Sequence, residues 1–245
     1  MRNFRLDLSY DGTRYKGWQK LSSTDNTIQC KVETLLSRLL EQKIEVAASG
    51  RTDAGVHARQ QVCSFHAETE KSCAEILSGL RAYLPKDVGA LSLSEAPERF
   101  HARYNCAEKT YLYRIRTSET PDVFSRSFVY AFPEKLDLAA MRRAAELLTG
   151  EHDFSAFTTA KHMKRSAVRT IREIRFDETQ EELRIFFTGD GFLYNTVRIL
   201  VGTLLEVGTG KRSPEEIPEI FASRTRENAG FTAPACGLTL WEVRY

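Results

Sequence analysis

The spacing of apolar residues changes along this chain, and that change restricts the fold more than any other feature. Apolar and polar residues alternate over residues 4–10, which predicts a strand with one buried face. Over residues 28–40 the apolar positions recur three and four apart, which predicts an amphipathic helix. Strand and helix patterns continue in no regular order, and several neighbouring strands could pair as hairpins. The sequence therefore predicts the α+β class.

The remaining boundaries follow from the same patterns and from capping residues. Asn26 is the expected N-cap of the first helix, with Gln29 as its reciprocal partner. The polar stretch from Pro97 to Arg103 has the composition of a boundary, so we expect two parts, residues 1–103 and 104–245. Further strands are expected over residues 44–48, 62–65, 109–116, 128–132, 168–176, 183–188 and 239–245, and further helices over 137–148, from Gly191, and from Ser213 with Pro218 inside it.

The composition is that of an ordinary globular protein with almost no net charge. The 245 residues are 42% hydrophobic and 28% charged, and 35 Lys and Arg against 33 Asp and Glu leave a charge of +2. Five cysteines without a repeated spacing, and an N-terminus without an apolar signal core, favour a reducing cytoplasm. No apolar run reaches about 18 residues, which argues against a membrane-spanning helix. Near neutrality disfavours nucleic-acid binding unless positive charge gathers on one surface.

Three common kinds of functional site are disfavoured by residue spacing. Cys63 and His66 would point to opposite faces of a strand, so we expect no metal site there. Residues 208–212 lack the spacing of a phosphate-binding loop, and a loop after a helix is the simpler interpretation. The sequence contains no Gly-x-Ser-x-Gly motif and no recognisable pairing of a nucleophilic Cys with a His.

A loop bracketed by glycines, residues 50–55, contains Asp53. Glycine permits backbone approaches that a side chain would block, so this loop could present a carboxylate at the edge of a sheet. An aspartate in such a loop more often serves turn formation alone, and the residues of the loop do not decide between the two roles.

One expected strand, residues 109–116, carries Lys109, Tyr111 and Tyr113 on a single face. This pattern fits ordinary packing on a sheet. It also fits an aromatic platform with a cation beside it, which would suit an unstacked nucleic-acid base.

The helix expected after Gly191 is apolar nearly all round, yet it contains Arg198 at the margin of its apolar stripe. An unpaired buried charge is costly, so we expect a carboxylate partner for this arginine. Asp53 is a candidate, but the sequence does not rank it above Glu206 or any other acid.

Basic residues gather in two parts of the chain, and each group could simply be a solvated face. The first group is Lys161, Lys164, Arg165, Arg169, Arg172 and Arg175, and the second is Arg2, Arg5, Arg14, Lys16 and Lys20. Tyr15 and Trp18 look exposed beside the second group. Together these features favour a surface for a polyanion.

Motifs spread over nearly the full length resemble those of the TruA-type tRNA pseudouridine synthases. Their number and order carry the resemblance, since each one alone is short. They are Tyr10-Asp11-Gly12-Thr13, Gly17-Trp18-Gln19, the nine residues from Gly50 to Ala58, Phe100-His101-Ala102-Arg103, Lys109-Thr110-Tyr111, the six residues from His152 to Phe157, Gly191-Phe192-Leu193-Tyr194-Asn195 followed by Val197-Arg198, the five residues from Gly208 to Arg212, and Thr232-Ala233-Pro234-Ala235 with Gly237-Leu238.

The resemblance implies two related α+β lobes that share an extended, mainly antiparallel sheet with a central cleft. It implies that Asp53 is the nucleophile, that Arg198 pairs with it, that Tyr111 stacks on the base with a possible part in proton transfer, and that Arg51 fills the space of the flipped nucleotide. It further implies a homodimer without metal or organic cofactor, whose substrates are uridines 38, 39 and 40 in the anticodon arm of tRNA. We expect Arg59, Lys109, Lys164, Arg165 and Arg169 to help bind the RNA.

The chain departs from the family pattern at a few positions, and other functions compete with the one it implies. Arg59-Gln60 replaces a small residue and Gly, and Arg59 would alter how the RNA backbone is held. A noncatalytic RNA-binding module would use the same basic and aromatic residues without needing Asp53. A nucleoside hydrolase would use a carboxylate, but that chemistry usually needs a second one, which the Asp53 loop lacks.

Overall fold

The computed structural model describes residues 1–120, 122–160 and 166–245, and these group into two compact units. Unit 1 is Met1–Ala107 with Leu240–Tyr245, and unit 2 is Glu108–Thr239. The sequence placed the division at residues 103 and 104 and assigned the C-terminal strand to the second part. At the C-terminus the structure groups Leu240–Tyr245 with unit 1 instead.

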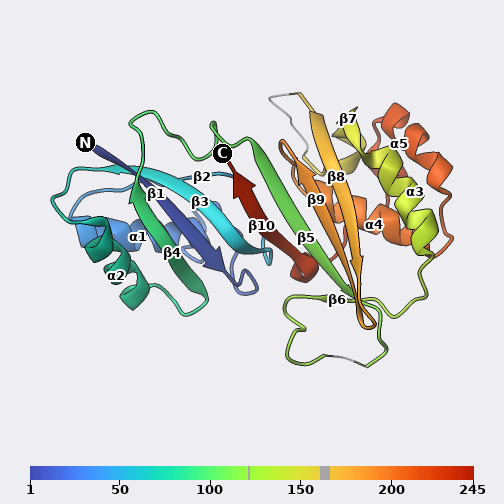
Figure 1. Ribbon diagram of the computed structural model, residues 1–245, viewed down its shortest axis with the longest axis horizontal. Helices are drawn as coiled ribbons and strands as arrows, with labels where there is room; N and C mark the ends of the chain where they lie inside the picture. The colour runs from blue at the N-terminus through green and yellow to red at the C-terminus, as the bar shows by residue number, and fades with distance from the viewer. Residues whose placement is uncertain (121, 161–165) are drawn as a thin grey trace. The chain divides into compact units, whose positions relative to one another are not determined.

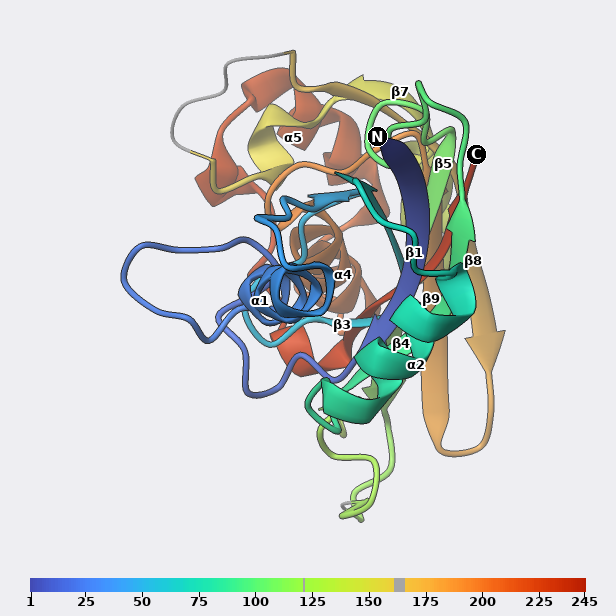
Figure 2. The same ribbon diagram turned by 90° about the vertical axis from the view of Figure 1, so that its left-hand side faces the viewer.

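Unit 1 is an antiparallel sheet with two helices (Figure 1). Its strands run in the order β4, β1, β3, β10, with β2 paired to β3. Alternate residues of β1 form the core, since Phe4, Leu6 and Leu8 are fully buried, as the period of two predicts. Figure 2 shows this sheet nearly edge-on, with α1 on one side of it. The bounds are β1 Arg2–Tyr10, α1 Ile28–Leu40, β2 Ala47–Ala48, β3 His57–Ala67, α2 Cys73–Tyr83, β4 Val88–Glu95 and β10 Leu238–Arg244.

The start of α1 corrects one capping prediction. Thr27, not Asn26, is the N-cap, and its hydroxyl accepts a hydrogen bond from the backbone N–H of Cys30. The side chain of Asn26 instead donates to the carbonyl of Arg14. Gln29 accepts from the backbone of Lys20 rather than closing a capping box. Both predicted capping side chains therefore fasten the preceding loop.

Unit 2 also combines an antiparallel sheet with helices, and both units thus belong to the predicted α+β class (Figure 1). Its strand order is β5, β9, β8, β7, and β6 pairs with β5 in parallel. The bounds are β5 Glu108–Arg116, β6 Tyr130–Ala131, α3 Leu138–Leu148, β7 Gly150–Asp153, η1 Phe154–Phe157, β8 Val168–Glu178, β9 Glu182–Gly189, α4 Thr196–Gly208, η2 Pro214–Glu216, α5 Ile217–Ser223, η3 Arg226–Asn228 and η4 Ala235–Gly237.

One predicted helix boundary in unit 2 is wrong and another is confirmed. The helix expected from Gly191 begins only at Thr196, because Asn195 has a left-handed backbone with φ 63°. The helix start predicted at Ser213 is present, since Ser213 caps the 3-10 helix η2 with a capping box and α5 follows it. Pro218 then lies in the first turn of α5, where its missing N–H costs nothing. Across residues 1–120, 122–160 and 166–245, no helix is both long and apolar enough to cross a membrane.

Candidate active site

Asp53 is half-buried in the loop that leads into β3, between a buried Thr52 and an exposed Ala54. The loop is held from outside by the segment that follows β1. Trp18 donates its backbone N–H to the carbonyl of Thr52 at 3.0 Å, and the N–H of Gly55 bonds to the carbonyl of Tyr15 at 3.3 Å. Two backbone bonds thus fix the loop on both sides of the carboxylate.

Gly12 allows this segment to approach the loop closely. A Cβ at Gly12 would lie 1.9 Å from the carbonyl oxygen of Val56, far inside any contact distance. The N–H of Gly12 also donates to Nδ1 of His57 at 3.0 Å, so that ring nitrogen acts as an acceptor. Only glycine fits between β1 and the Asp53 loop at this position.

Buried polar side chains support the loop from inside unit 1. The hydroxyls of Tyr10 and Thr52 lie 2.8 Å apart, and Gln61 donates its amide to the carbonyl of Gly50 at 2.9 Å. Gln61 is fully buried and accepts from the hydroxyl of Ser49. Burial raises the pKa of Tyr10, which therefore stays a neutral phenol. The network gives the Asp53 loop a defined position.

The N-terminal aromatic residues are buried, and most of the basic residues near them are paired with acids. Tyr15 and Trp18 are buried, so the prediction that they are exposed is wrong. Tyr15 donates its hydroxyl to Asp87, and Trp18 packs near the ring of Tyr10. Four of the basic residues are paired with acids, as Arg2 with Glu95, Arg5 with Asp7, Arg14 with Asp87 and Lys20 with Glu33.

Arg51 and Arg59, the other predicted RNA contacts of unit 1, are both exposed. The guanidinium of Arg59 lies over the ring of Trp241, 4.1 Å from its centroid, in a cation–π contact. Its neighbour Gln60 bonds to the carboxylate of Asp7 and accepts from the backbone of Val243. The Arg59-Gln60 pair thus contacts both strands that flank β3, namely β1 and β10.

The tyrosines predicted on one face of β5 differ in their surroundings. Tyr113 is fully buried and donates its hydroxyl to the carbonyl of Pro234 at 2.8 Å, and burial raises its pKa. Tyr111 is also buried, with its ring at right angles to Phe192 at a centroid distance of 5.3 Å. Lys109 is half-buried on the same strand. Packing therefore explains Tyr113, whereas Tyr111 keeps its candidacy as the stacking residue.

Arg198 is half-buried in the first turn of α4 and is held by two acceptors within unit 2. Its Nε donates to the carbonyl of Ala233 at 2.6 Å, and its Nη1 donates to Oδ1 of Asn195 at 3.0 Å. Glu206, the alternative carboxylate partner, is bonded instead to Arg212 at 3.1 Å and to the N–H of Phe231. It also lies two turns further along the same helix, about 12 Å away along the axis.

Close packing against α4 fixes the segment that carries the carbonyl of Ala233. A Cβ at Gly202 would lie 1.8 Å from the carbonyl oxygen of Phe231. One residue later, the hydroxyl of Thr203 accepts from the N–H of Gly230 at 2.9 Å and donates to the carbonyl of Ile199. The strand-like segment therefore rests directly on the helix backbone and supports Arg198 from one side.

Comparison with known proteins identifies the family of the chain. A model of the tRNA pseudouridine synthase family matches residues 8–105 and 144–245. The chain belongs to this family. Its members are isomerases that act on uridine in tRNA, and the match bears out the TruA-type resemblance.

Curated relatives match this sequence over its whole length. The tRNA pseudouridine synthase A of Bacillus sp. (strain KSM-64) is 45% identical over 100% of both chains. The tRNA pseudouridine synthase A 1 of Clostridium tetani (strain Massachusetts / E88) is 43% identical over 100% of both chains. A chain in the crystal structure of the archaeal box H/ACA sRNP Nop10-Cbf5 complex has a TM-score of 0.35 and 14% identity, covering 83% of this chain and 43% of that one.

In this synthase family member the basic group of unit 2 is only partly described. Lys164 and Arg165, with Lys161, lie outside the described residues. Arg169 is half-buried at the start of β8, and its guanidinium bonds to the carbonyls of Ser166 and Val168.

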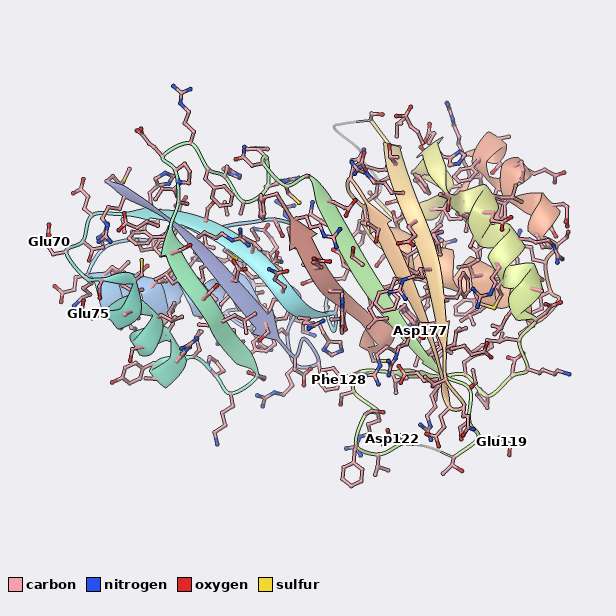
Figure 3. All side chains as sticks on the ribbon, in the orientation of Figure 1. Glu70, Glu75, Glu119, Asp122, Phe128 and Asp177 are labelled. Carbon is pink, nitrogen blue, oxygen red and sulfur yellow. The ribbon has the colours of Figure 1, made fainter. Side chains whose placement is uncertain are left out.

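The charge of β8 itself changes along the strand. Along β8, Arg172 pairs with Glu108 and Arg175 lies over Phe186. Acidic Asp177 is near the opposite end of β8 from Arg169, on the side where Figure 3 also shows Asp122. The strand thus runs from a basic end toward an acidic one.

The motif after α4 has a structural explanation. Gly208 ends α4, and Lys211 and Arg212 pair with nearby glutamates, as the simpler interpretation of that loop predicts. Cys63 is buried while His66 is exposed, so the two side chains do point apart. Among the described residues, no group of three His, Cys, Asp or Glu is placed to hold a metal ion.

Sequence reasoning missed two residues that hold the synthase's candidate side chains. Gln61 supports the Asp53 loop from within β3, and it was missed because the strand predicted here begins only at residue 62. Asn195 contacts Arg198, and its position three residues before the arginine was a signal, since residues three apart approach each other near a helix start.

The candidate residues are divided between the two units. Unit 1 contains Asp53, Arg51 and Arg59, and unit 2 contains Tyr111, Lys109 and Arg198. The pairing of Arg198 with Asp53 therefore stays a prediction.

Proposed function

We propose that this chain isomerises uridine to pseudouridine at positions 38, 39 and 40 of the anticodon arm of tRNA, with Asp53 as nucleophile. The observation that carries the proposal is the support of Asp53, whose loop is fixed by two backbone bonds and a buried polar network. Such support holds the side chain in one position, as a nucleophile requires. The full-length identity of 45% to a tRNA pseudouridine synthase A adds to it.

The reaction breaks the bond between N1 and C1′ and forms a bond between C5 and C1′. C5 loses its proton and N1 gains one, so the atoms balance without an oxidant, reductant or external group. The carboxylate of Asp53 would begin the reaction by attacking C1′, which gives a glycosyl ester, or by adding at C6 of the base. We expect no metal or organic cofactor, because isomerisation needs none.

The other candidate residues take roles that follow from their chemistry. Arg198 would face Asp53 with its terminal nitrogens and favour the ionised carboxylate, as an opposite charge does. Tyr111 would pack against the flipped uracil, and Arg51 would fill the space that the nucleotide leaves in the stem. As a base for the C5 proton, a tyrosine with an ordinary pKa near 10 needs a water relay.

The RNA would be bound by local charge rather than by bulk attraction. Lys109, Arg59 and Arg169, with Lys164 and Arg165, supply the positive charge, and β8 turns acidic away from them. We also propose that the enzyme works as a homodimer in the cytoplasm, with each tRNA touching both subunits and with the two units as the family's two lobes around a central cleft. Such a dimer would carry only twice the charge of +2, which limits indiscriminate RNA binding.

The test is Asp53→Asn, assayed by tritium release from unmodified tRNA labelled at uracil C5. We expect no release, with tRNA affinity within about threefold of wild type, because Asn keeps the size of the side chain and loses its nucleophilic oxygen. Asp25→Asn is the matched control, since Asp25 is exposed on a loop before α1. Substrates carrying uridine at only one of the three positions report the site preference. Full release by Asp53→Asn would favour a noncatalytic role for Asp53 and overturn the proposal.

A further inference from the structure

The side chain of Asn195, the residue before α4, does not form the hydrogen bond usual for its position. Asn195 is the N-cap of the helix, yet its side chain makes no capping hydrogen bond. An Asn at this position usually accepts from the second or third N–H of the helix and so stabilises it. Here Oδ1 accepts from Nη1 of Arg198 at 3.0 Å instead. The chain gives up a cap and gains a contact to the guanidinium.

The orientation of the amide follows from its two partners. A guanidinium can only donate, so the oxygen of the amide must face Arg198. The nitrogen then points to Thr159, and Nδ2 donates to its hydroxyl at 2.7 Å. The amide is therefore held at both ends.

Further contacts fix the backbone of Asn195, and so the position of its side-chain amide. The hydroxyl of Thr158, a buried residue, donates to the carbonyl of Tyr194 at 2.8 Å. Asn195 itself has φ 63° and ψ 2°, a left-handed conformation that Asn tolerates far better than most residues. Backbone shape and amide chemistry both favour Asn at this place.

We propose that Asn195 is a positioning residue that aims the guanidinium of Arg198. This rests on the proposed function, in which Arg198 faces the carboxylate of Asp53. Ala233 holds Nε at 2.6 Å from one side, and Asn195 holds Nη1 from another. Two acceptors on different segments define the plane of the guanidinium, so its terminal nitrogens present a fixed edge to a carboxylate.

The experiment uses Asn195→Gly, because glycine keeps the left-handed backbone without strain and removes only the amide. We expect the single-turnover rate on tRNA to fall about 30-fold, in the range for losing one hydrogen bond to a charged group. The affinity for tRNA should stay within about twofold, and the midpoint of thermal unfolding should stay near wild type. Asn228→Gly, an exposed position in η3, is the matched control and should leave the rate unchanged.

A double-mutant cycle with Arg198→Lys separates positioning from a general structural effect. If Asn195 acts through Arg198, adding Asn195→Gly to Arg198→Lys slows the reaction by less than about twofold, since the guanidinium is already gone. Losses that multiply would overturn the inference, as would a normal rate in Asn195→Gly. If Asn195→Gly fails to fold, Thr159→Val serves in its place and should slow the reaction about threefold by releasing Nδ2.

The outcomes keep the inference apart from the proposed function. If Arg198→Lys reacts slowly and Asn195→Gly reacts at the normal rate, the positioning role of Asn195 is wrong and the role of Arg198 stands. A normal rate in Arg198→Lys removes the role of Arg198 from the proposed function, and with it the reason for aiming the guanidinium.

Discussion

The two units support their candidate side chains by different means. Unit 1 holds Asp53 on a loop, through a neighbouring loop and buried side chains such as Gln61. Unit 2 holds Arg198 on a helix, through the carbonyl of Ala233 and the amide of Asn195. A glycine lies at the closest approach in each case, Gly12 for the loop and Gly202 for the helix. The comparison shows two ways to position a side chain, by buried polar groups around a loop and by acceptors beside a helix.

The helix side should be the less tolerant of added volume. In Gly202→Ala the new carbon would lie 1.8 Å from the carbonyl of Phe231, in a helix that is buried almost throughout. We expect a loss of about 3 kcal/mol in the free energy of unfolding, at the upper end for overpacking, despite the better helix propensity of Ala. Hydrogen exchange of α4 peptides should accelerate while that of α1 peptides does not. Gly191→Ala, where the carbon meets Arg169 at 3.6 Å, should change stability by less than about 0.5 kcal/mol. Equal acceleration in α1 and α4 would show that the units do not unfold separately.

The loop side should lose activity more than stability. In Gly12→Ala the carbon would lie 1.9 Å from the carbonyl of Val56, and the loop can shift where a helix cannot. We expect a loss of about 2 kcal/mol and a fall in turnover of at least about 100-fold, because the Asp53 loop moves with Val56. Trp18 and Trp241 both lie in unit 1, so tryptophan fluorescence during a urea titration follows this unit. If Gly12→Ala showed the expected loss of stability with unchanged turnover, the coupling of Gly12 to Asp53 would be contradicted.

Two hydroxyl deletions provide the smallest and most closely matched comparison. Thr203→Val leaves the buried N–H of Gly230 without its acceptor, and we expect a cost of about 1.5 kcal/mol. Thr52→Val leaves the hydroxyl of Tyr10, which still lies 3.4 Å from the amide of Gln61, so we expect about 1 kcal/mol. Urea midpoints of the two variants measure the difference. A larger cost for Thr52→Val would mean that the loop network carries more of the stability than the helix contact.

The elements whose patterns are local were predicted well. The period of two in residues 4–10 identified β1, and the stripe over residues 28–40 identified α1, because each pattern reports burial of one face. Capping was less predictable, since Asn26 and Thr27 are both good N-caps and tertiary contacts decide between them. The late start of α4 depends on a left-handed residue, Asn195, which no hydrophobic pattern reveals.

The candidate residues of the site could be named from the sequence, whereas the contacts that hold them could not. Motif resemblance pointed to Asp53, and burial on an apolar helix pointed to a partner for Arg198. The anchors are distant in sequence, as in the contact of Gly12 with Val56, and spacing carries no record of such pairs. Tyr15 and Trp18 were misjudged for the same reason, because polar and basic neighbours in the sequence do not show what covers an aromatic ring.

The discontinuity of unit 1 has a consequence for biosynthesis. Residues 1–107 leave the ribosome first, but the strand β10 that belongs with them follows only after the whole of unit 2. At ordinary elongation rates that interval is on the order of ten seconds. During it the nascent sheet exposes the edge of β3, a hydrogen-bonding template that invites wrong partners until β10 arrives. Chaperones that shield open sheet edges would therefore act on the first-made part of this polypeptide.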